Sequence, residues 1–234
     1  MLLVPLHDDN PTRRFAALTA ASVAINAAVF LYQLTLDERA GMFFVLGYGM
    51  VPAVLGGTAE LPPHIDTLDP WLTVVSSMFL HGSLMHVAGN MLYLWTFGNN
   101  VEDSMGRARF ALFYLACGFA AALSQALVDF RSEIPMIGAS GAVSGVLAAY
   151  LLLHPHAKVY SFAFFRFAWL PAWTVLGFWI VVQLANGLME DADAGGVAWW
   201  AHIGGFAAGL VLLPLFKRRD VKLFAGRNRT GPWG

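Results

Sequence analysis

Six stretches of the sequence contain no Asp, Glu, Lys or Arg, and this pattern restricts the fold more than any other feature. Each run is about as long as the roughly 20 apolar residues that a helix needs to cross a bilayer. A spanning segment must satisfy its backbone hydrogen bonds internally, so runs of this length predict membrane helices. The runs cover residues 15–36, 71–101, 110–128, 134–153, 167–189 and 194–216.

The composition agrees with a membrane location. Hydrophobic side chains make up 58% of the chain and charged ones only 12%, and the mean hydropathy is +0.60. These values exclude an ordinary soluble domain. We therefore predict an all-α, polytopic bundle of six spanning helices over residues 15–216, with an N-terminal tail at 1–14 and a basic C-terminal tail at 217–234.

The positions of the charges predict how the bundle lies in the membrane. Of the 14 Lys and Arg residues, only Arg39 and Arg131 fall in the first, third or fifth loop between the runs. Basic residues collect on the cytoplasmic side, so both termini are expected there, in a bacterial-type inner membrane. The opposite side then carries a group of acidic residues: Glu60, Asp66, Asp69, Glu190, Asp191 and Asp193.

A further uncharged stretch, residues 40–59, lies in the first loop. Six Gly and Pro residues interrupt it, which disfavours a regular spanning helix. If it crossed the membrane, the basic C-terminal tail would move to the outer side, against the charge bias. We predict a helical, partly embedded element in the first outer loop; the alternative is a seventh span.

Polar side chains inside a membrane are costly, and three of the runs contain several of them. The second has His81, His86 and Asn90, the fourth begins near Ser140, and the sixth contains His202. All three runs start on the outer side, and at about 1.5 Å per residue these groups lie at similar depth. Other amides in the runs are interpreted as hydrogen-bonding between helices: Asn26, Gln125, Gln183 and Asn186.

The polar layer has the composition of a serine hydrolase site. Ser140 would be the nucleophile and His202 the general base, since serine needs a base to take its proton. No carboxylate lies within the runs, so a dyad is expected. Oxyanion donors would be His86, Asn90 and the Ser140 backbone N–H. Supporting roles are assigned to His81 and to three glycines that allow close approach: Gly138, Gly141 and Gly205.

Each signal also has a structural interpretation. Gly-x-Ser-Gly is frequent as a helix-packing motif in membranes, and a single His or Asn in a span often bonds a neighbouring helix. The occurrence of all these polar groups at one depth favours a catalytic role.

The motifs resemble those of the rhomboid intramembrane serine proteases. The resemblance covers roughly residues 71–209. It includes His-x4-His-x3-Asn-Met at 81–91, Glu-x3-Gly at 102–106, Gly-x-Ser-Gly at 138–141 and His-x-Gly-Gly-x3-Gly at 202–209. It implies a Ser140/His202 dyad in a water-filled cavity open to the outer side, and a gate for the substrate at the fifth helix and the loop after it.

Two positions depart from the family pattern. Many members have a Trp-Arg pair in the first loop, whereas Trp71 is followed here by Leu72. Some place a tyrosine against the imidazole, four residues after the nucleophile; here that residue is Ser144. The resemblance therefore does not say what supports the His202 ring.

The predicted partners are transmembrane protein substrates and the lipid bilayer, with no nucleic acid, cofactor or metal. A metalloprotease would need His-Glu-x-x-His, which the sequence does not contain. Two alternatives stay open: a catalytically silent relative that binds membrane helices, and a small transporter that uses the polar cluster as its substrate site.

Overall fold

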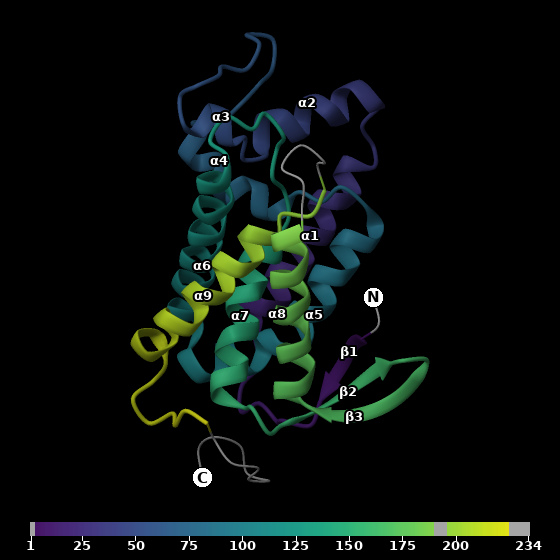
Figure 1. Ribbon diagram of the computed structural model, residues 1–234, viewed down its shortest axis with the longest axis vertical. Coiled ribbons are helices and arrows are strands. Elements are labelled where there is room, and N and C mark those ends of the chain that lie inside the picture. Colours follow the sequence, from purple (N-terminus) through teal and green to yellow (C-terminus); the bar gives the residue numbers. More distant parts are fainter. Residues whose placement is uncertain (1–2, 190–195, 225–234) are drawn as a thin grey trace.

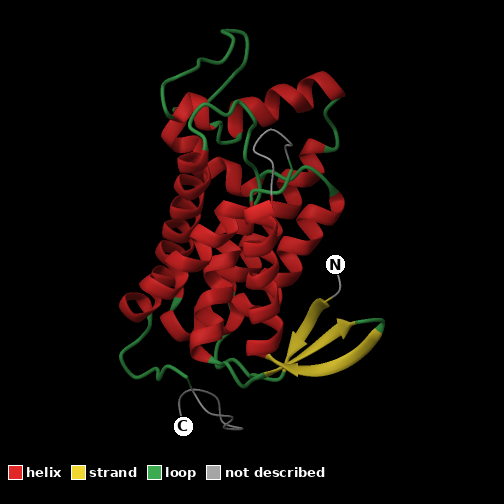
Figure 2. Cartoon of the chain, viewed as in Figure 1, coloured by secondary structure: helices red, strands yellow, loops and turns green. Residues whose placement is uncertain are grey.

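The computed structural model describes residues 3–189 and 196–224. Most of them form helices, and Figures 1 and 2 show these packed side by side along the long axis, with a small sheet at one end. Each uncharged run overlaps one of the bundle's main helices, and α5 and α6 extend beyond their runs into charged residues: α1 (Ala17–Gln33), α5 (Leu84–Met105), α6 (Arg107–Val128), α7 (Ser140–Leu153), α8 (Ala172–Met189) and α9 (Trp199–Phe216).

Length and apolar composition separate these helices into two groups. Among the described residues, α6, α8 and α9 are long and apolar enough to cross a membrane, and α5 joins them when it is taken together with the bent segment before it. Helices α1 and α7 are apolar but shorter than 18 residues. By this measure the described chain has three or four candidate spans rather than six.

The predicted second span is broken. Its first part forms α4 (Pro70–Ser76) and the 3₁₀ turn η1 (Ser77–Phe79), and the chain then bends by 85° into α5. Ser83 is the N-cap of α5. Its backbone is extended, and its side chain accepts a hydrogen bond from the His86 N–H at 3.1 Å. This bend places His81 beside the first turn of α5.

The first loop is helical, as predicted. It forms α2 (Glu38–Tyr48) and α3 (Pro52–Leu55), and neither is long enough to be the seventh span of the alternative. Two backbone hydrogen bonds between Met50 and Met136 pair this loop with the segment that precedes α7. The loop thus lies over the region that holds Ser140.

A three-stranded antiparallel sheet corrects the all-α prediction. Its order is β1 (Leu3–Asp8), β2 (Lys158–Ala163) and β3 (Arg166–Pro171). Strand β1 comes from the segment placed in the N-terminal tail, and β3 takes the first residues of the predicted fifth span. Burial alternates along β2, so one sheet face packs on the helices while the other is open.

Helix α7 lies at the centre of the bundle and is buried from Gly141 to Tyr150. It packs closely on α9, where a Cβ on Gly205 or Gly209 would collide with the carbonyl oxygens of Gly141 and Gly145. The missing side chains therefore allow backbone-to-backbone contact between the two helices.

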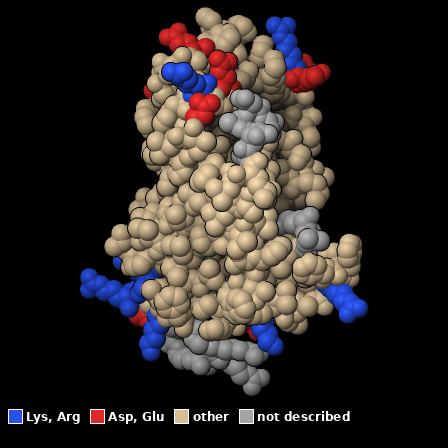
Figure 3. Space-filling view, in the orientation of Figure 1, with Lys and Arg blue, Asp and Glu red and all other residues tan. Residues whose placement is uncertain are grey.

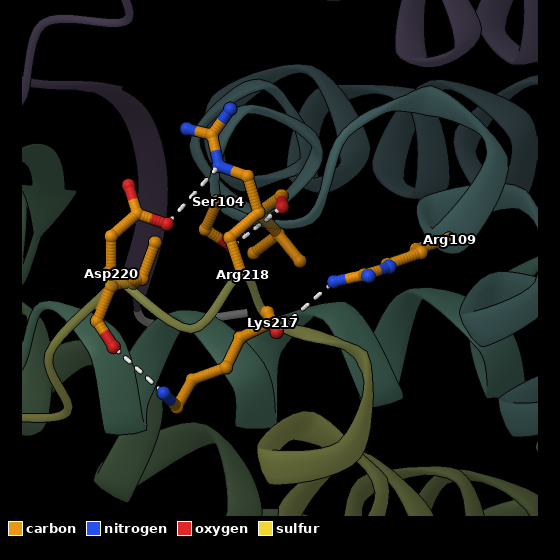
Figure 4. Close-up of polar contacts among 7 residues, drawn as sticks. Ser104, Arg109, Lys217, Arg218 and Asp220 are labelled. Atoms are coloured by element: carbon orange, nitrogen blue, oxygen red, sulfur yellow. Dashed lines mark hydrogen bonds and ion pairs between the residues drawn. The ribbon is translucent and has the colours of Figure 1, made fainter.

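Charges gather at the two ends of the molecule and leave an uncharged band between them (Figure 3). At the basic end, the segment after α9 is fastened to the helices, because the Arg218 N–H donates to the Ser104 carbonyl at 3.0 Å. Figure 4 shows this contact and the neighbouring contacts of Arg109, Lys217 and Asp220. Five charged residues used in the topology prediction lie outside the described residues: Glu190, Asp191, Asp193, Arg227 and Arg229.

Candidate functional site

One cavity of about 640 Å³ brings together the four polar residues expected at a common depth. Ser140 comes from α7, His202 from α9, and His86 and Asn90 from α5. The remaining walls include Tyr93, Trp179, Ile137 and Ala198. Residues from four separate helices therefore face one space, as a binding or catalytic site requires.

Ser140 is the first residue of α7, next to a backbone turn that requires glycine. Gly138 has φ of +116°, and a Cβ there would collide with the imidazole of His86. The Gly138 N–H donates to the Ser77 carbonyl at 2.8 Å, which fixes this turn to the η1 segment. The chain is thereby held where the Ser140 side chain reaches the cavity.

Ser144 lies one turn further along α7 and is completely buried. Its hydroxyl donates to the carbonyl oxygen of Ser140 at 2.6 Å. The serine at this position thus contacts its own helix.

His202 is buried near the start of α9, and its ring is held from α8. Its Nδ1 lies 2.7 Å from Oε1 of Gln183. The ring of Trp179, also on α8, lies 5.9 Å away between centroids, and Trp199 approaches edge-on at 6.1 Å. Gln183 therefore fills the supporting position that the family pattern left open.

Asn90 is held by His81, which lies in the bent segment before α5. Its Nδ2 lies 3.0 Å from Nε2 of buried His81, while the His81 and His86 rings pack edge to face with centroids 4.9 Å apart. The His81 backbone exchanges two hydrogen bonds with the Gln33 side chain of α1, at 3.0 and 3.2 Å. An amide NH₂ has two donors, so Asn90 keeps one N–H beyond its contact with His81.

The amides interpreted as interhelical divide into two groups. Gln183 joins α8 to α9, and Gln125 of α6 accepts from the Ala201 N–H at 3.2 Å, as predicted. Asn26 and Asn186 instead donate to carbonyls one turn earlier in their own helices, so that interpretation was wrong for them. Gln183 was the site residue whose role sequence reasoning missed, because no spacing rule pairs residues 183 and 202.

Within the part of the chain that the structure describes, no three His, Cys, Asp or Glu side chains are grouped so as to hold a metal ion. The cavity offers instead a hydroxyl, two imidazoles and an amide.

Taken together, the fold and the site define a helical membrane protein with a serine and a histidine on one internal cavity. The Rhomboid domain matches residues 69–219, and the chain belongs to the rhomboid family. Family membership makes it a multi-pass membrane protein.

The chain is similar in sequence to several named proteins. It is 35% identical over 157 residues to RHOMBOID-like protein 1 of Arabidopsis thaliana, covering 67% of this chain and 37% of the relative. It is 27% identical over 179 residues to Rhomboid-type serine protease 2 of Emericella nidulans, covering 76% and 33%. Rhomboid protease GluP of Bacillus subtilis is 38% identical over 81 residues, covering 35% and 15%. The matched part thus spans about a third or less of these relatives.

Proposed function

We propose that the protein is an intramembrane serine endopeptidase that cleaves transmembrane segments of other proteins with a Ser140/His202 dyad. The observation that carries this proposal is the convergence of Ser140, His202, His86 and Asn90 on one cavity. Two relatives that are named proteases support it. Six spans with both termini on the basic side are part of the same proposal.

In the proposed reaction, a substrate segment enters the cavity and unwinds, since a helical peptide bond is shielded by its own hydrogen bonds. His202 takes the Ser140 proton as the hydroxyl oxygen attacks the scissile carbonyl carbon. The imidazolium then gives this proton to the leaving amine. Water, deprotonated by His202, releases the acyl group and regenerates Ser140.

The oxyanion that forms during attack needs hydrogen-bond donors. The Asn90 N–H that is not used by His81, the Ser140 backbone N–H and the His86 ring are the proposed donors. Ser140 is at the start of α7, where backbone N–H groups are without partners inside the helix. The partial positive charge of a helix N-terminus favours an anion at this position.

The alternatives of a silent helix-binding relative and of a transporter make different predictions about Ser140. Both would leave the hydroxyl no more reactive than an ordinary serine. An activated serine reacts covalently with a fluorophosphonate, so this reagent distinguishes the proposals.

The test combines labelling and cleavage on purified protein in lipid. Wild type should label with a fluorophosphonate and cleave a membrane-anchored substrate, whereas Ser140→Ala and His202→Ala should do neither. Ser161→Ala is the control, because Ser161 lies in β2 of the sheet and does not line the cavity. Cleavage by Ser140→Ala at the wild-type rate would refute the assignment.

A further inference from the structure

We propose that Gln183 is a positioning residue that selects the tautomer in which His202 can act as a base. This inference rests on the proposed function and deepens it. Gln183 is buried in α8, 19 residues before His202, and its Oε1 lies 2.7 Å from the imidazole Nδ1.

The orientation of the Gln183 amide follows from its second contact. Its Nε2 lies 3.2 Å from the backbone carbonyl of Trp179, which can only accept. The NH₂ end must therefore point to its own helix, and the oxygen end must point to His202. A flipped amide would set its oxygen against the Trp179 carbonyl oxygen, and this bond would be lost.

The protonation of the ring follows in turn. An amide oxygen only accepts, so Nδ1 of His202 carries the proton and donates it. A neutral imidazole has a single N–H, which leaves Nε2 as the unprotonated nitrogen. His202 lines the cavity that Ser140 also lines, so Nε2 is the nitrogen available to take the serine proton.

The direct test is the ¹⁵N spectrum of histidine-labelled protein, in which protonated and unprotonated ring nitrogens have different shifts. The His202 signals are assigned by their loss in His202→Asn. We expect wild type to show a protonated Nδ1, and Gln183→Met, a variant of similar size without an acceptor, to show a mixture of tautomers. A mixture in wild type would overturn the inference.

Kinetics provide the second readout. Gln183→Met should lower kcat roughly 10- to 100-fold with KM little changed, a part of the ~10²- to 10⁴-fold that a general base supplies. Gln183→Glu keeps an acceptor oxygen at the same reach and should recover part of kcat. Asn186→Leu is the matched control one turn along α8, since Asn186 bonds only its own helix in the described structure.

The outcomes separate this inference from the proposed function. If Ser140→Ala is inactive and Gln183→Met keeps wild-type kcat, only the role of Gln183 is wrong. If Ser140→Ala is active, the proposed function itself fails.

A second inference comes from the β2–β3 hairpin at the basic end. The geometry points to insertion of its aromatic face into the headgroup region of the bilayer leaflet on that side. The residues on the open face and at the turn form this aromatic surface: Tyr160, Phe162, Phe164, Phe165, Phe167 and Trp169. In Figure 1 the hairpin projects sideways from the bundle, beside the ends of α7 and α8.

The turn of the hairpin is unusual in its residues. Phe164 and Phe165 both have positive φ, 49° and 65°, and their side chains are 64% and 87% exposed. A two-residue turn of this kind favours Asn-Gly, and a bulky side chain there is strained. Lipid contact explains why two phenylalanines occupy it.

The charges beside the aromatic surface and the position of the hairpin next to a candidate span indicate that lipid covers this surface. Lys158 and Arg166 flank the aromatic surface, and β3 continues directly into the candidate span α8. Aromatic rings with adjacent basic groups are typical of a membrane interface with anionic headgroups.

A nitroxide label at Phe165→Cys in phosphatidylcholine/phosphatidylglycerol nanodiscs tests this inference. The label should collide readily with oxygen and poorly with a water-soluble nickel complex. The control label replaces Asp220, an exposed residue at the same end, and should show the opposite. Hydrogen exchange of the β2 amides verifies that the hairpin is formed; if Phe165→Cys opens it, the label moves to Phe167. If the hairpin is formed and the label at Phe165 or Phe167 collides readily with the nickel complex, the proposal is wrong.

Discussion

The hydroxyl of Tyr150, in the middle of the bundle, donates a hydrogen bond of 2.5 Å to Oδ2 of Asp8, in the strand β1. Asn100 of α5 donates to the same oxygen at 3.0 Å. Burial raises the pKa of Asp8 from 3.8 to about 7, although the bond from Tyr150 acts in the opposite direction. This carboxyl joins β1 to the two helices α5 and α7.

The raised pKa predicts that β1 is held less firmly as the pH rises. The folded state favours protonated Asp8, so its contribution is complete below pH 3.8 and is lost as the pH rises through about 7. Hydrogen exchange of residues 3–8, corrected for the intrinsic rate, should show more opening at pH 8 than at pH 5. Asp8→Asn should remove this difference; a variant with the wild-type pH dependence would contradict the prediction.

Asn90 should contribute to turnover more than to folding. Asn90→Ala removes a proposed oxyanion donor and should lower kcat about 10²- to 10³-fold while leaving measurable activity. Thr96→Val is the control on the same helix, because the buried Thr96 hydroxyl has no partner among the described residues. Equal kcat values for the two variants, measured with a fluorogenic membrane substrate, would exclude Asn90 from the site.

The contact between α7 and α9 should not tolerate even one methyl group. Gly205→Ala would drive its Cβ into the Gly141 carbonyl, and overpacking of this kind typically costs about 1–3 kcal/mol. We expect a lower melting temperature and lower activity. Gly177→Ala in α8 has open space around it and should be neutral or slightly stabilising. Similar melting temperatures for both variants in detergent would contradict the packing argument.

Glu102 should stabilise the start of α1. Its buried carboxylate accepts from the Leu18 and Thr19 N–H groups at 3.1 and 2.8 Å, and from the Thr19 hydroxyl at 2.9 Å. Hydrogen bonds to a charged group contribute about 1.5–3 kcal/mol, so Glu102→Ala should lower the unfolding free energy by about 2 kcal/mol or more. Exposed Glu133 gives the control, and a Glu133→Ala loss of the same size would refute the capping role.

The sequence predicts the helices well where a charge-free run coincides with one regular element. It fails at residues 81–83, because both sides of the bend are apolar and only the cap at Ser83 separates them. It also gives β3 and α8 as a single predicted span, because residues 167–171 are uncharged and the absence of charge does not distinguish a strand from a helix. Strand β1 pairs with residues about 150 positions away, and no local pattern reveals such a partner.

The grouping of the four candidate site residues was predictable from the sequence, while their catalytic roles stay a prediction. Helical rise alone placed Ser140, His202, His86 and Asn90 in one layer, and the structure puts them on one cavity. Which nitrogen of His202 meets which neighbour depends on the rotation of α8 against α9. That rotation is set by packing across the whole interface, so the pairing with Gln183 required coordinates.

The contact of Gly141 and Gly145 with Gly205 and Gly209 has a consequence for how the molecule can move. Two helices that touch through their backbones have no side chains between them to repack, so they shift only as one block. Ser140 and His202 both belong to that block. The relative position of the helices that carry the hydroxyl and the imidazole is therefore set by backbone contact and not by the choice of side-chain rotamers.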